Sequence, residues 1–319
     1  MVGQLIIRNG DKDYYPTVVE DVVWTTERCG APSKLEFKVI KDDVLNFTEG
    51  NQVTFYWDNT PVFHGYVFTK KRDKEDVISV VAYDQLRYLK NKDTYVYTNK
   101  TASEVVKLIA EDFKLQLGTI DDTGYKIPSR TEDSQTLFDI IQNALDITIQ
   151  NRKELFILYD DFGKLTLRKM SNMKVNILID SETAENFSYT SSIDEATYNK
   201  IKLYYDNEAT GKRDIYVEQS GESINAWGTL QYYDKIGEGE NGKAKAQTLL
   251  QLYNKKTRKL SIENAFGDVR VRAGCMIGVH LLLGDVELNN WMLVESCKHT
   301  FKLDEHYMDI TVRGGEFVG

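Results

Sequence analysis

The amino-acid sequence predicts an α+β chain that is mainly β, with two β-barrel domains and inserted helical and small β-hairpin segments. Two stretches share one pattern of strands and turns, Ser33–Asp84 near the start and Arg258–Gly315 near the end. Short strands at regular spacing, separated by turn residues, are typical of barrels and sandwiches. Helical stripes of apolar residues occur only between the two stretches.

The two stretches agree in pattern and spacing more than in identity. Leu35 precedes Gly50 by 15 residues, and Leu260 precedes Gly274 by 14. After each glycine come a strand, a polar tip, a returning strand, a charged loop and a closing alternating strand. A duplicated unit in one chain indicates a protein with two equivalent surfaces, which assembly requires more than catalysis does.

The first ninety residues are predicted to form strands, because their apolar residues alternate or run together between Gly, Pro, Asn and Asp. A turn is expected at 30–33 and a hairpin tip at 58–61. The expected strands are Asp21–Thr26, Leu35–Ile40, Val53–Trp57, Val62–Phe68 and Val77–Tyr83.

Two helices are expected next. Thr101 and Glu104 form a capping-box pattern in front of an apolar stripe. Asp133 or Ser134 is predicted to cap a second amphipathic helix. The segment Thr119–Arg130 between the helices is predicted to be a loop.

A hairpin follows, with strands Leu155–Tyr159 and Lys164–Arg168 around Gly163, which supplies the positive φ of the turn. Asn199–Asp206 and Asp214–Gln219 are predicted to form a second strand pair. A third helix is expected after the glycine-rich loop that comes next, immediately before the second β-unit.

Length and element order predict three parts, since 319 residues are too many for one ordinary core. We expect a first barrel domain at 1–95 and a helical and small α+β insertion at 96–198. A second barrel domain with one helix is expected at 199–319.

The composition describes a soluble globular chain, with 41% hydrophobic and 28% charged residues. A net charge of −9 and a pI of about 5.2 argue against specific nucleic-acid binding, which needs a basic face. Three cysteines predict folding in a reducing compartment. The start lacks a signal-peptide pattern and the longest apolar run, Met276–Leu283, is far short of a bilayer span. We therefore expect synthesis in the cytoplasm and no membrane insertion.

Gly237–Gly242 matches the pattern G-x-G-x-x-G, between a possible strand and a helix. A dinucleotide site uses that turn to bring backbone amides to a pyrophosphate. Glu238 and Glu240 would set negative charge against the phosphates, and no parallel strand–helix–strand unit is expected around the motif. An acidic loop is therefore favoured over a cofactor site.

Cys297 and His299 are two residues apart, which places both on one face of an expected strand. His306 and His280 would be the further ligands of a zinc site. Structural zinc sites usually show paired close spacings, and only one exists here. A strand pair with a partly polar face is therefore favoured over a metal site.

Three pairs of adjacent acids occur, Asp42-Asp43, Asp121-Asp122 and Asp160-Asp161. Glycoside hydrolysis needs two carboxylates that face each other, whereas neighbouring residues on a strand or turn point apart. No serine sits in a G-x-S-x-G elbow. We predict no catalytic, cofactor-binding or metal-binding residues, and no enzyme activity.

Two short basic clusters remain, Lys70–Arg72 and Lys255–Arg258. Each is interpreted as a solvated loop or helix end, where cations complement the helix dipole. The alternative is contact with an acidic partner, because complementary charge sets register in assemblies.

The run Ala82–Tyr95 is the most distinctive in the chain. It resembles the baseplate hub proteins of contractile phage tails, in particular the XkdQ and YqbQ family of PBSX-type prophages. The resemblance spans nearly the whole chain. It continues through Gly30–Phe37, Glu49–Asn51, Thr101–Ser103, Asp139–Asp146, Leu158–Leu165, Gly267–Gly274 and His306–Met308.

The resemblance implies a structural hub with two tail-tube-like β-barrel domains per chain. In such families a homotrimer presents six similar barrels, which match a hexameric tail tube on one side and a trimeric spike on the other. The implied place is the virion tail baseplate, or that of a phage-tail-like particle, with the tail tube protein, the spike protein and other baseplate proteins as partners. Two alternatives stay open, a cell-wall hydrolase of the tail tip and a receptor- or glycan-binding tail module.

Overall fold

The computed structural model describes residues 3–180, 183, 185–194, 196–207, 211–237, 241–283 and 286–314. Strands dominate, so the mainly β class is confirmed. The chain divides into two compact units, one of Met1–Ser188 with Ser261–Val318 and the other of Tyr189–Leu260. The predicted domains 1–95, 96–198 and 199–319 follow the two repeats in the sequence, whereas the two units above are defined by how compactly their residues pack. The predicted division stays a prediction.

The first repeat forms an antiparallel run of strands that we call the first module, in the order β3-β4-β7-β6-β5-β1, with β2 beside β1. Every strand expected in this region is confirmed. At the predicted hairpin tip Asp58 and Asn59 have φ of 47° and 61°, which suits the two-residue turns that match strand twist. The strands are β1 (Gly3–Asn9), β2 (Lys12–Tyr14), β3 (Val18–Glu27), β4 (Lys34–Ile40), β5 (Gln52–Trp57), β6 (Thr60–Arg72) and β7 (Val77–Tyr83).

The second repeat forms the second module, in the order β14-β18-β21-β20-β19-β13. Its predicted tip at 284–285, and Gly315 at the end of the repeat, lie outside the described residues. The strands are β13 (Lys174–Ile179), β14 (Asn186–Ser192), β18 (Thr257–Phe266), β19 (Met276–Leu283), β20 (Val286–Phe301) and β21 (His306–Gly314).

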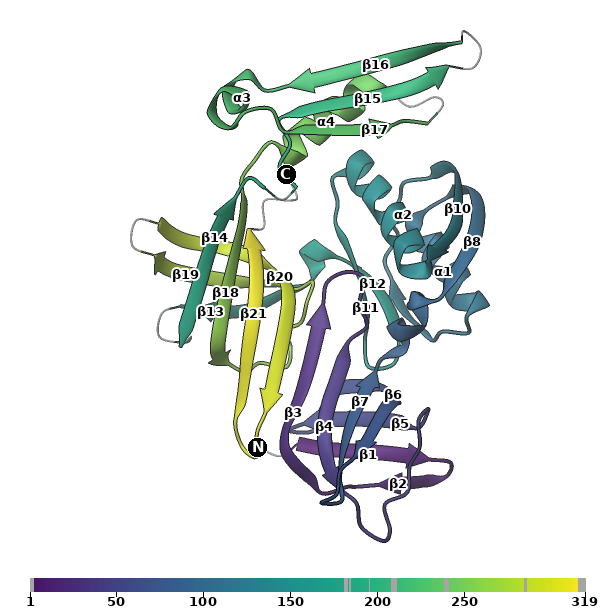
Figure 1. Ribbon diagram of the computed structural model, residues 1–319, viewed down its shortest axis with the longest axis vertical. Coiled ribbons are helices and arrows are strands. Elements are labelled where there is room, and N and C mark those ends of the chain that lie inside the picture. The colour runs from purple at the N-terminus through teal and green to yellow at the C-terminus, as the bar shows by residue number, and fades with distance from the viewer. Residues whose placement is uncertain are drawn as a thin grey trace. The chain divides into compact units, whose positions relative to one another are not determined.

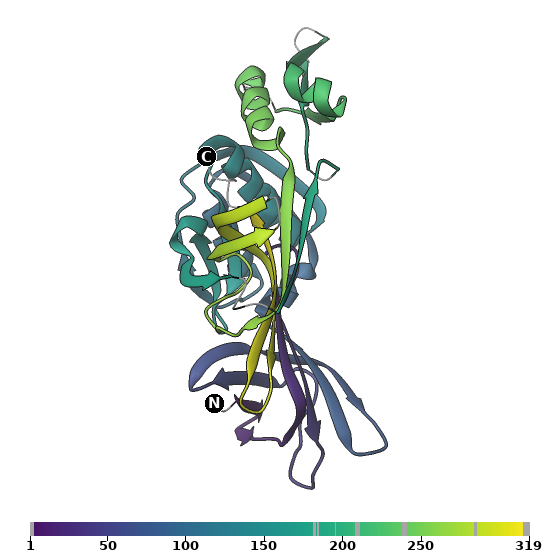
Figure 2. The same ribbon diagram turned by 90° about the vertical axis from the view of Figure 1, so that its left-hand side faces the viewer.

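The two modules share one 13-stranded sheet, because β20 pairs with β3. β20 is long enough to have two neighbours on one edge: β19 pairs with its first half and β3 with Ser296–Phe301, while β21 occupies the other edge. Figure 1 shows β20 (yellow) and β3 (purple) side by side. Figure 2 shows the same strands from the side.

Each module is an open run of strands rather than a closed barrel. No pairing among the described strands closes either module on itself. The physical reason lies at the junction, where β3 and β20 satisfy each other's edges instead of closing their own modules. The buried core of the first module includes Leu35, Phe55 and Val80, and Phe301 of β20 packs into it.

Between the modules lies an insertion of helices and short strands. The capping box at Thr101 and Glu104 is confirmed, since each side chain bonds the other's backbone amide. Leu165 and Ile141 belong to its separate buried core. The elements are η1 (Gln85–Lys90), β8 (Lys92–Lys100), α1 (Ala102–Asp112), β9 (Leu117–Ile120), β10 (Ile127–Thr136), α2 (Leu137–Arg152), β11 (Phe156–Asp160), β12 (Leu165–Lys169) and η2 (Met170–Asn172).

Two predictions fail within this insertion. The segment Thr119–Arg130 is not all loop, because it contains the end of β9 and the start of β10. The second helix is capped by Thr136, whose side chain accepts a hydrogen bond from the Asp139 amide, and not by Asp133 or Ser134. The helix cannot begin before Thr136, because β10 stays paired with β8 up to that residue.

The second compact unit is a three-stranded sheet with two helices. The predicted strand pair and third helix are confirmed there. Its core combines buried Ile201 and Leu249 with half-buried tyrosines, of which Tyr232 and Tyr253 stack with ring centroids 5.8 Å apart. No described helix has the length and apolar character needed to cross a membrane. The elements are β15 (Lys200–Asn207), β16 (Lys212–Gln219), α3 (Gly221–Trp227), β17 (Gln231–Lys235) and α4 (Gly242–Tyr253).

Candidate functional site: the duplicated module and its junction

A glycine starts the same hydrogen-bonded turn in both modules. Gly50 has φ of +83° and Gly274 has φ of +93°, a region that favours glycine. The Gly50 amide donates to the carbonyl of Val67 at 2.8 Å, and the Gly274 amide donates to that of Val294 at 2.8 Å. Each valine amide donates back to the carbonyl of the residue after the glycine, at 2.8 and 2.9 Å. The repeat predicted from spacing is therefore a repeat of backbone geometry.

A β-bulge follows the same valine in both modules. The β6–β7 register shifts between Val67 and Thr69, and the β20–β21 register shifts between Val294 and Ser296. Bulges are built features that bend and twist a strand. Together with the matching strand order, they make β6 and β20 structural equivalents. The modules differ at their ends, since β1 is antiparallel to β5 while β13 is parallel to β19.

The junction between the modules is buried and aromatic. His299 on β20 lies opposite Trp24 on β3, and the two rings stack with centroids 4.9 Å apart. The Thr26 hydroxyl accepts a hydrogen bond from the Ala273 amide at 2.9 Å. These contacts link residues near the start of the chain to residues near its end, which fixes the modules as one sheet.

An ion pair flanks this junction. The Arg28 guanidinium lies 2.7 Å from the Glu295 carboxylate, and both side chains are about four-fifths buried, with 19% and 21% of their surface exposed. Glu295 is also the bulge residue of β20. A largely buried charge-assisted pair fixes geometry more than an exposed one does.

The residues considered for zinc form a buried row instead. The Cys297 sulfur lies 3.1 Å from His299 Nε2, and His299 Nδ1 lies 2.8 Å from His306 Nε2. His280 is elsewhere, 3.6 Å from the Glu287 carboxylate. Among the described residues no group of three or more His, Cys, Asp or Glu side chains is arranged to hold a metal ion.

Both junction histidines are neutral. Burial lowers the pKa of His299 to about 3 and that of His306 to about 4. His299 Nε2 lies 2.8 Å from the Val271 carbonyl, so this nitrogen carries the proton and donates. Nδ1 then accepts from His306 Nε2. The row is a satisfied hydrogen-bond chain in the core of the junction.

One acid of each adjacent pair accepts a hydrogen bond from a backbone amide two or three residues further on. The Asp160 carboxylate accepts hydrogen bonds from the Gly163 amide at 2.6 Å and from Gln85 Nε2 at 2.9 Å. The Asp42 carboxylate accepts from the amides of Val44 and Leu45.

Asp84 and Asp160 form a further acidic pair, which a search for acids adjacent in the sequence does not find. Burial, followed by repulsion from Asp160, raises the pKa of Asp84 to about 8. Both Asp84 oxygens accept backbone amides, from Ser33 and Leu86, at 3.0 Å each. A carboxyl so enclosed has a structural role, at the point where the first module meets the insertion. No spacing signal in the sequence identifies it.

The glycine motif lies partly outside the described residues, because 238–240 are not described. β17, which precedes the motif, runs parallel to β15, but β18, which follows α4, belongs to another sheet, so the described strands form no parallel strand–helix–strand unit around the motif. Gly242 begins α4 under the Asn241 cap, and a side chain at Gly242 would overlap the ring of Tyr216. Close packing against Tyr216 thus explains one glycine of the motif.

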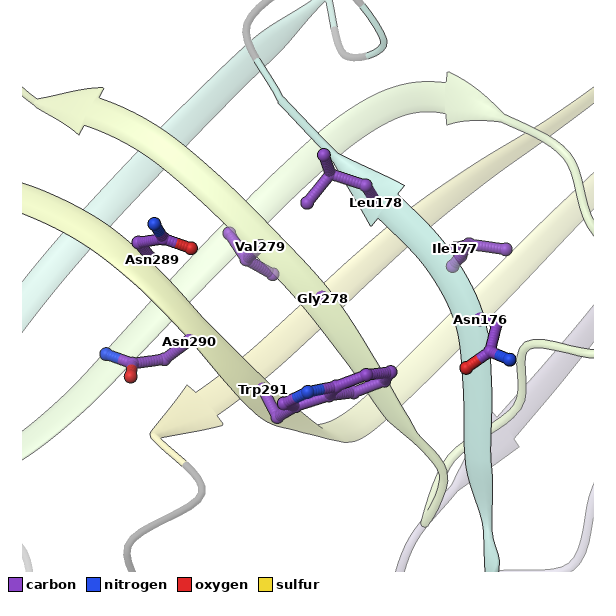
Figure 3. A pocket seen from close by; sticks show the side chains of 8 residues that line it. All are labelled: Asn176, Ile177, Leu178, Gly278, Val279, Asn289, Asn290 and Trp291. Carbon is purple, nitrogen blue, oxygen red and sulfur yellow. The ribbon is translucent and has the colours of Figure 1, made fainter.

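An open depression of about 550 Å³ lies on β13, β19 and β20 (Figure 3). The Trp291 ring extends towards β13, where Lys174 Nζ lies 5.1 Å from its centroid. The walls combine amides with apolar side chains, and the lining residues are Asn176, Ile177, Leu178, Gly278, Val279, Asn289, Asn290 and Trp291.

The basic clusters occupy two settings. Lys70–Arg72 ends β6, with Lys70 Nζ 4.4 Å from the centroid of the Phe47 ring and Arg72 paired with Asp76. Lys255–Arg258 follows α4 and enters β18, so it includes the expected position at a helix end. Lys71 is exposed, which leaves the first cluster available to a partner.

The fold of the chain is the fold of phage tail proteins of known structure. Its structure matches the 43 kDa tail protein of prophage MuSo2 from Shewanella oneidensis with a TM-score of 0.73 and 13% identity, over 99% of this chain and 100% of that one. The family model described as YQBQ-like matches residues 22–313. The chain belongs to the YqbQ-like family, which confirms the resemblance seen in the sequence.

Two relatives from Bacillus subtilis (strain 168) extend this result over the full length. They are the uncharacterized protein YqbQ and the phage-like element PBSX protein XkdQ. Each is 29% identical over 98% of this chain, and the matches cover 96% and 97% of the relatives.

Proposed function

We propose that the chain is a structural baseplate hub of a contractile phage tail or phage-tail-like particle. The observation that carries the proposal is the duplicated module, with equivalent glycine turns and equivalent bulges. Three chains with two equivalent modules each supply six similar surfaces to a hexameric tube and three to a trimeric spike.

The family and the fold support this role. One relative belongs to a phage-like element and one structural neighbour is a prophage tail protein. The proposed partners are further copies of the chain, the tail tube protein, the spike protein and other baseplate proteins. The proposed location is the baseplate of the tail, and the proposed role is structural rather than enzymatic.

Tail particles purified from a producing strain test the proposal. A tagged copy of the chain should be found in the particles, at half the number of tube subunits in one ring. Deleting the coding sequence should leave particles without joined tube and spike. Complete tails assembled without the chain would contradict the hub role.

A second candidate function, a receptor- or glycan-binding tail module, is favoured by the depression at Trp291. A flat aromatic ring beside several amides is suited to a sugar, which offers apolar faces and hydroxyl groups. Binding on a glycan array that is lost in Trp291→Ala, with an unchanged unfolding midpoint, would support it. Equal binding by both proteins would exclude the depression as a sugar site.

A further inference from the structure

The strand β14 is an uncharged, exposed edge of the sheet. It ends the strand order, and its sequence Asn186–Ser192 contains no charged residue and no proline. Five of its seven residues are exposed. Proteins usually protect such edges with charge, proline or short length, as β2 does at the opposite end with three residues that include Lys12 and Asp13. An unprotected edge strand is suited to pairing with another strand.

The strand β6 has an unpaired edge of the same kind. β7 pairs along one edge of β6 as far as Arg72, whereas β5 and the Gly50 turn cover the other edge only up to Val67. In the described chain the edge of Phe68–Arg72 on the β5 side has no strand beside it. Its lysines and arginine prevent it from pairing with a second copy of itself.

A pairing equivalent to one between these two edges already exists inside the chain, between β3 and β20. β20 is equivalent to β6, and the edge of β20 beyond its bulge pairs antiparallel with β3. β14 is in turn equivalent to β3, because β14 pairs with β18 as β3 pairs with β4. The β3–β20 junction inside one chain is therefore the template for a β14–β6 junction between chains.

Residue equivalences support this template. The Asn186 amide contacts the Glu263 carboxylate at 3.3 Å and Thr257 Oγ1 donates to the Ser192 carbonyl at 3.1 Å. Both contacts fit one antiparallel register, which sets Tyr189 opposite Leu260. Trp24 lies opposite Leu35 in the same way, and Leu35 and Leu260 are the matched leucines of the repeat.

This register equates Trp24-Thr25-Thr26 with Tyr189-Thr190-Ser191, so that aromatic and hydroxyl residues occupy matching positions. The bulge likewise equates Lys71 with Lys298. Within the chain Lys298 lies opposite Thr25, and between chains Lys71 would lie opposite Thr190. The next pair sets Arg72 beside Tyr189, a cation–π contact in place of the His299–Trp24 stack.

We infer that β14 of one copy of this chain pairs antiparallel with Phe68–Arg72 of a second copy, with Lys71 opposite Thr190. The contact is head-to-tail, since each copy offers one edge of each kind, and such contacts form a ring when the rotation between copies closes and an open filament when it does not. The inference names the surface through which copies of the proposed hub meet, and it rests on that proposal only for the number of copies in the ring.

Engineered disulfides test the pairing. Opposed residues on antiparallel strands have Cα atoms about 4.5–5.5 Å apart, within disulfide reach. In a Cys29→Ser background, which removes the exposed native thiol, Lys71→Cys with Thr190→Cys should oxidise to disulfide-linked oligomers that dithiothreitol returns to single chains. Lys71→Cys with Ser191→Cys is the matched control, because Ser191 points to the other face of the strand.

Lys298→Cys with Thr25→Cys is the positive control, since the same geometry exists inside one chain and should give an intrachain disulfide. If this control oxidises while Lys71→Cys with Thr190→Cys stays single-chain, the inferred pairing is overturned. Equal cross-linking in the Ser191→Cys control overturns the inferred register.

Light scattering on the same samples separates the inference from the proposed function. A cross-linked species of about 110 kDa, three times 36.7 kDa, supports both. A trimer in solution that the Lys71→Cys and Thr190→Cys pair does not link retains the hub and overturns the strand pairing. A ladder of linked chains that continues past three supports the pairing and contradicts the trimeric hub.

Discussion

The buried histidine pair makes the stability of the junction depend on pH. His299 and His306 are neutral in the folded protein because burial holds their pKa values at about 3 and about 4. In the unfolded chain a histidine has a pKa of about 6.5. Below pH 6.5 the unfolded state therefore binds more protons than the folded state, and the free energy of unfolding falls as the pH falls towards 4.

The expected size follows from these values. Each pH unit below 6.5 lowers the free energy of unfolding by about 1.4 kcal/mol for every histidine that stays neutral. Between pH 6.5 and 5 the fully buried His299 alone contributes about 2 kcal/mol. His306 is less buried and contributes less, because solvent screens its charge.

A buried carboxyl opposes this trend in the wild-type protein. Asp84 keeps its proton up to about pH 8 when folded, whereas the unfolded chain releases it near pH 4. Its contribution to stability is therefore full at low pH and is lost as the pH rises towards 8. Asp84 contributes equally to the wild type and to a variant that lacks His299. The difference between their free energies of unfolding therefore reports the contribution of His299 alone.

Urea unfolding of the wild type and His299→Gln, at half-unit steps from pH 5 to 7, provides the measurement. The free energy of unfolding of the wild type, minus that of the variant, should fall by about 2 kcal/mol between pH 6.5 and 5, because of the pKa shift of one histidine. A difference that stays constant over this range would refute a neutral, buried His299.

Three further predictions concern the glycine turns, a helix cap and the buried carboxyl. Gly274→Ala should destabilise the protein more than Gly50→Ala. Both positions need a positive φ, which costs alanine about 1–2 kcal/mol. Only at Gly274 does the added carbon also overlap a side chain, that of Ile157. Equal unfolding midpoints in urea would contradict this. Thr101→Ala should lower the free energy of unfolding by about 1 kcal/mol through loss of the capping box, with loss of helix seen by circular dichroism at a lower temperature. Asp84→Asn should flatten the fall in stability between pH 4 and 8, and an unchanged slope would show that Asp84 is ionised in the folded protein.

Local signals predicted the repeat and most of its strands. The positive φ at Gly50 and Gly274 has a sequence signature because glycine adopts it without the steric cost that a side chain brings, and the spacing of the two leucines set the register of the comparison. The cap at Thr101 was equally predictable, since both partners of the capping box lie within one turn.

Features that depend on distant partners had no such signal. β8 and β10 escaped prediction because most of their residues are polar and pair with each other, Thr98 with Ser129 for example, so that few apolar residues mark the strands. Asp84 and Asp160 are 76 residues apart and meet only through the fold. The spacing of Cys297 and His299 placed them on one face of a strand. The burial that excludes solvent and keeps the histidines neutral had no signal in the sequence.

The β3–β20 junction also sets the order in which the protein becomes complete during synthesis. Thr26 and its partner Cys297 are separated by 271 residues. At about 5–20 residues per second, the ribosome takes roughly 15–50 s to make the chain between them. Throughout that interval the nascent first module presents the open edge of Trp24 and its neighbours, so the newly made chain is most exposed to wrong pairing before its last hairpin emerges.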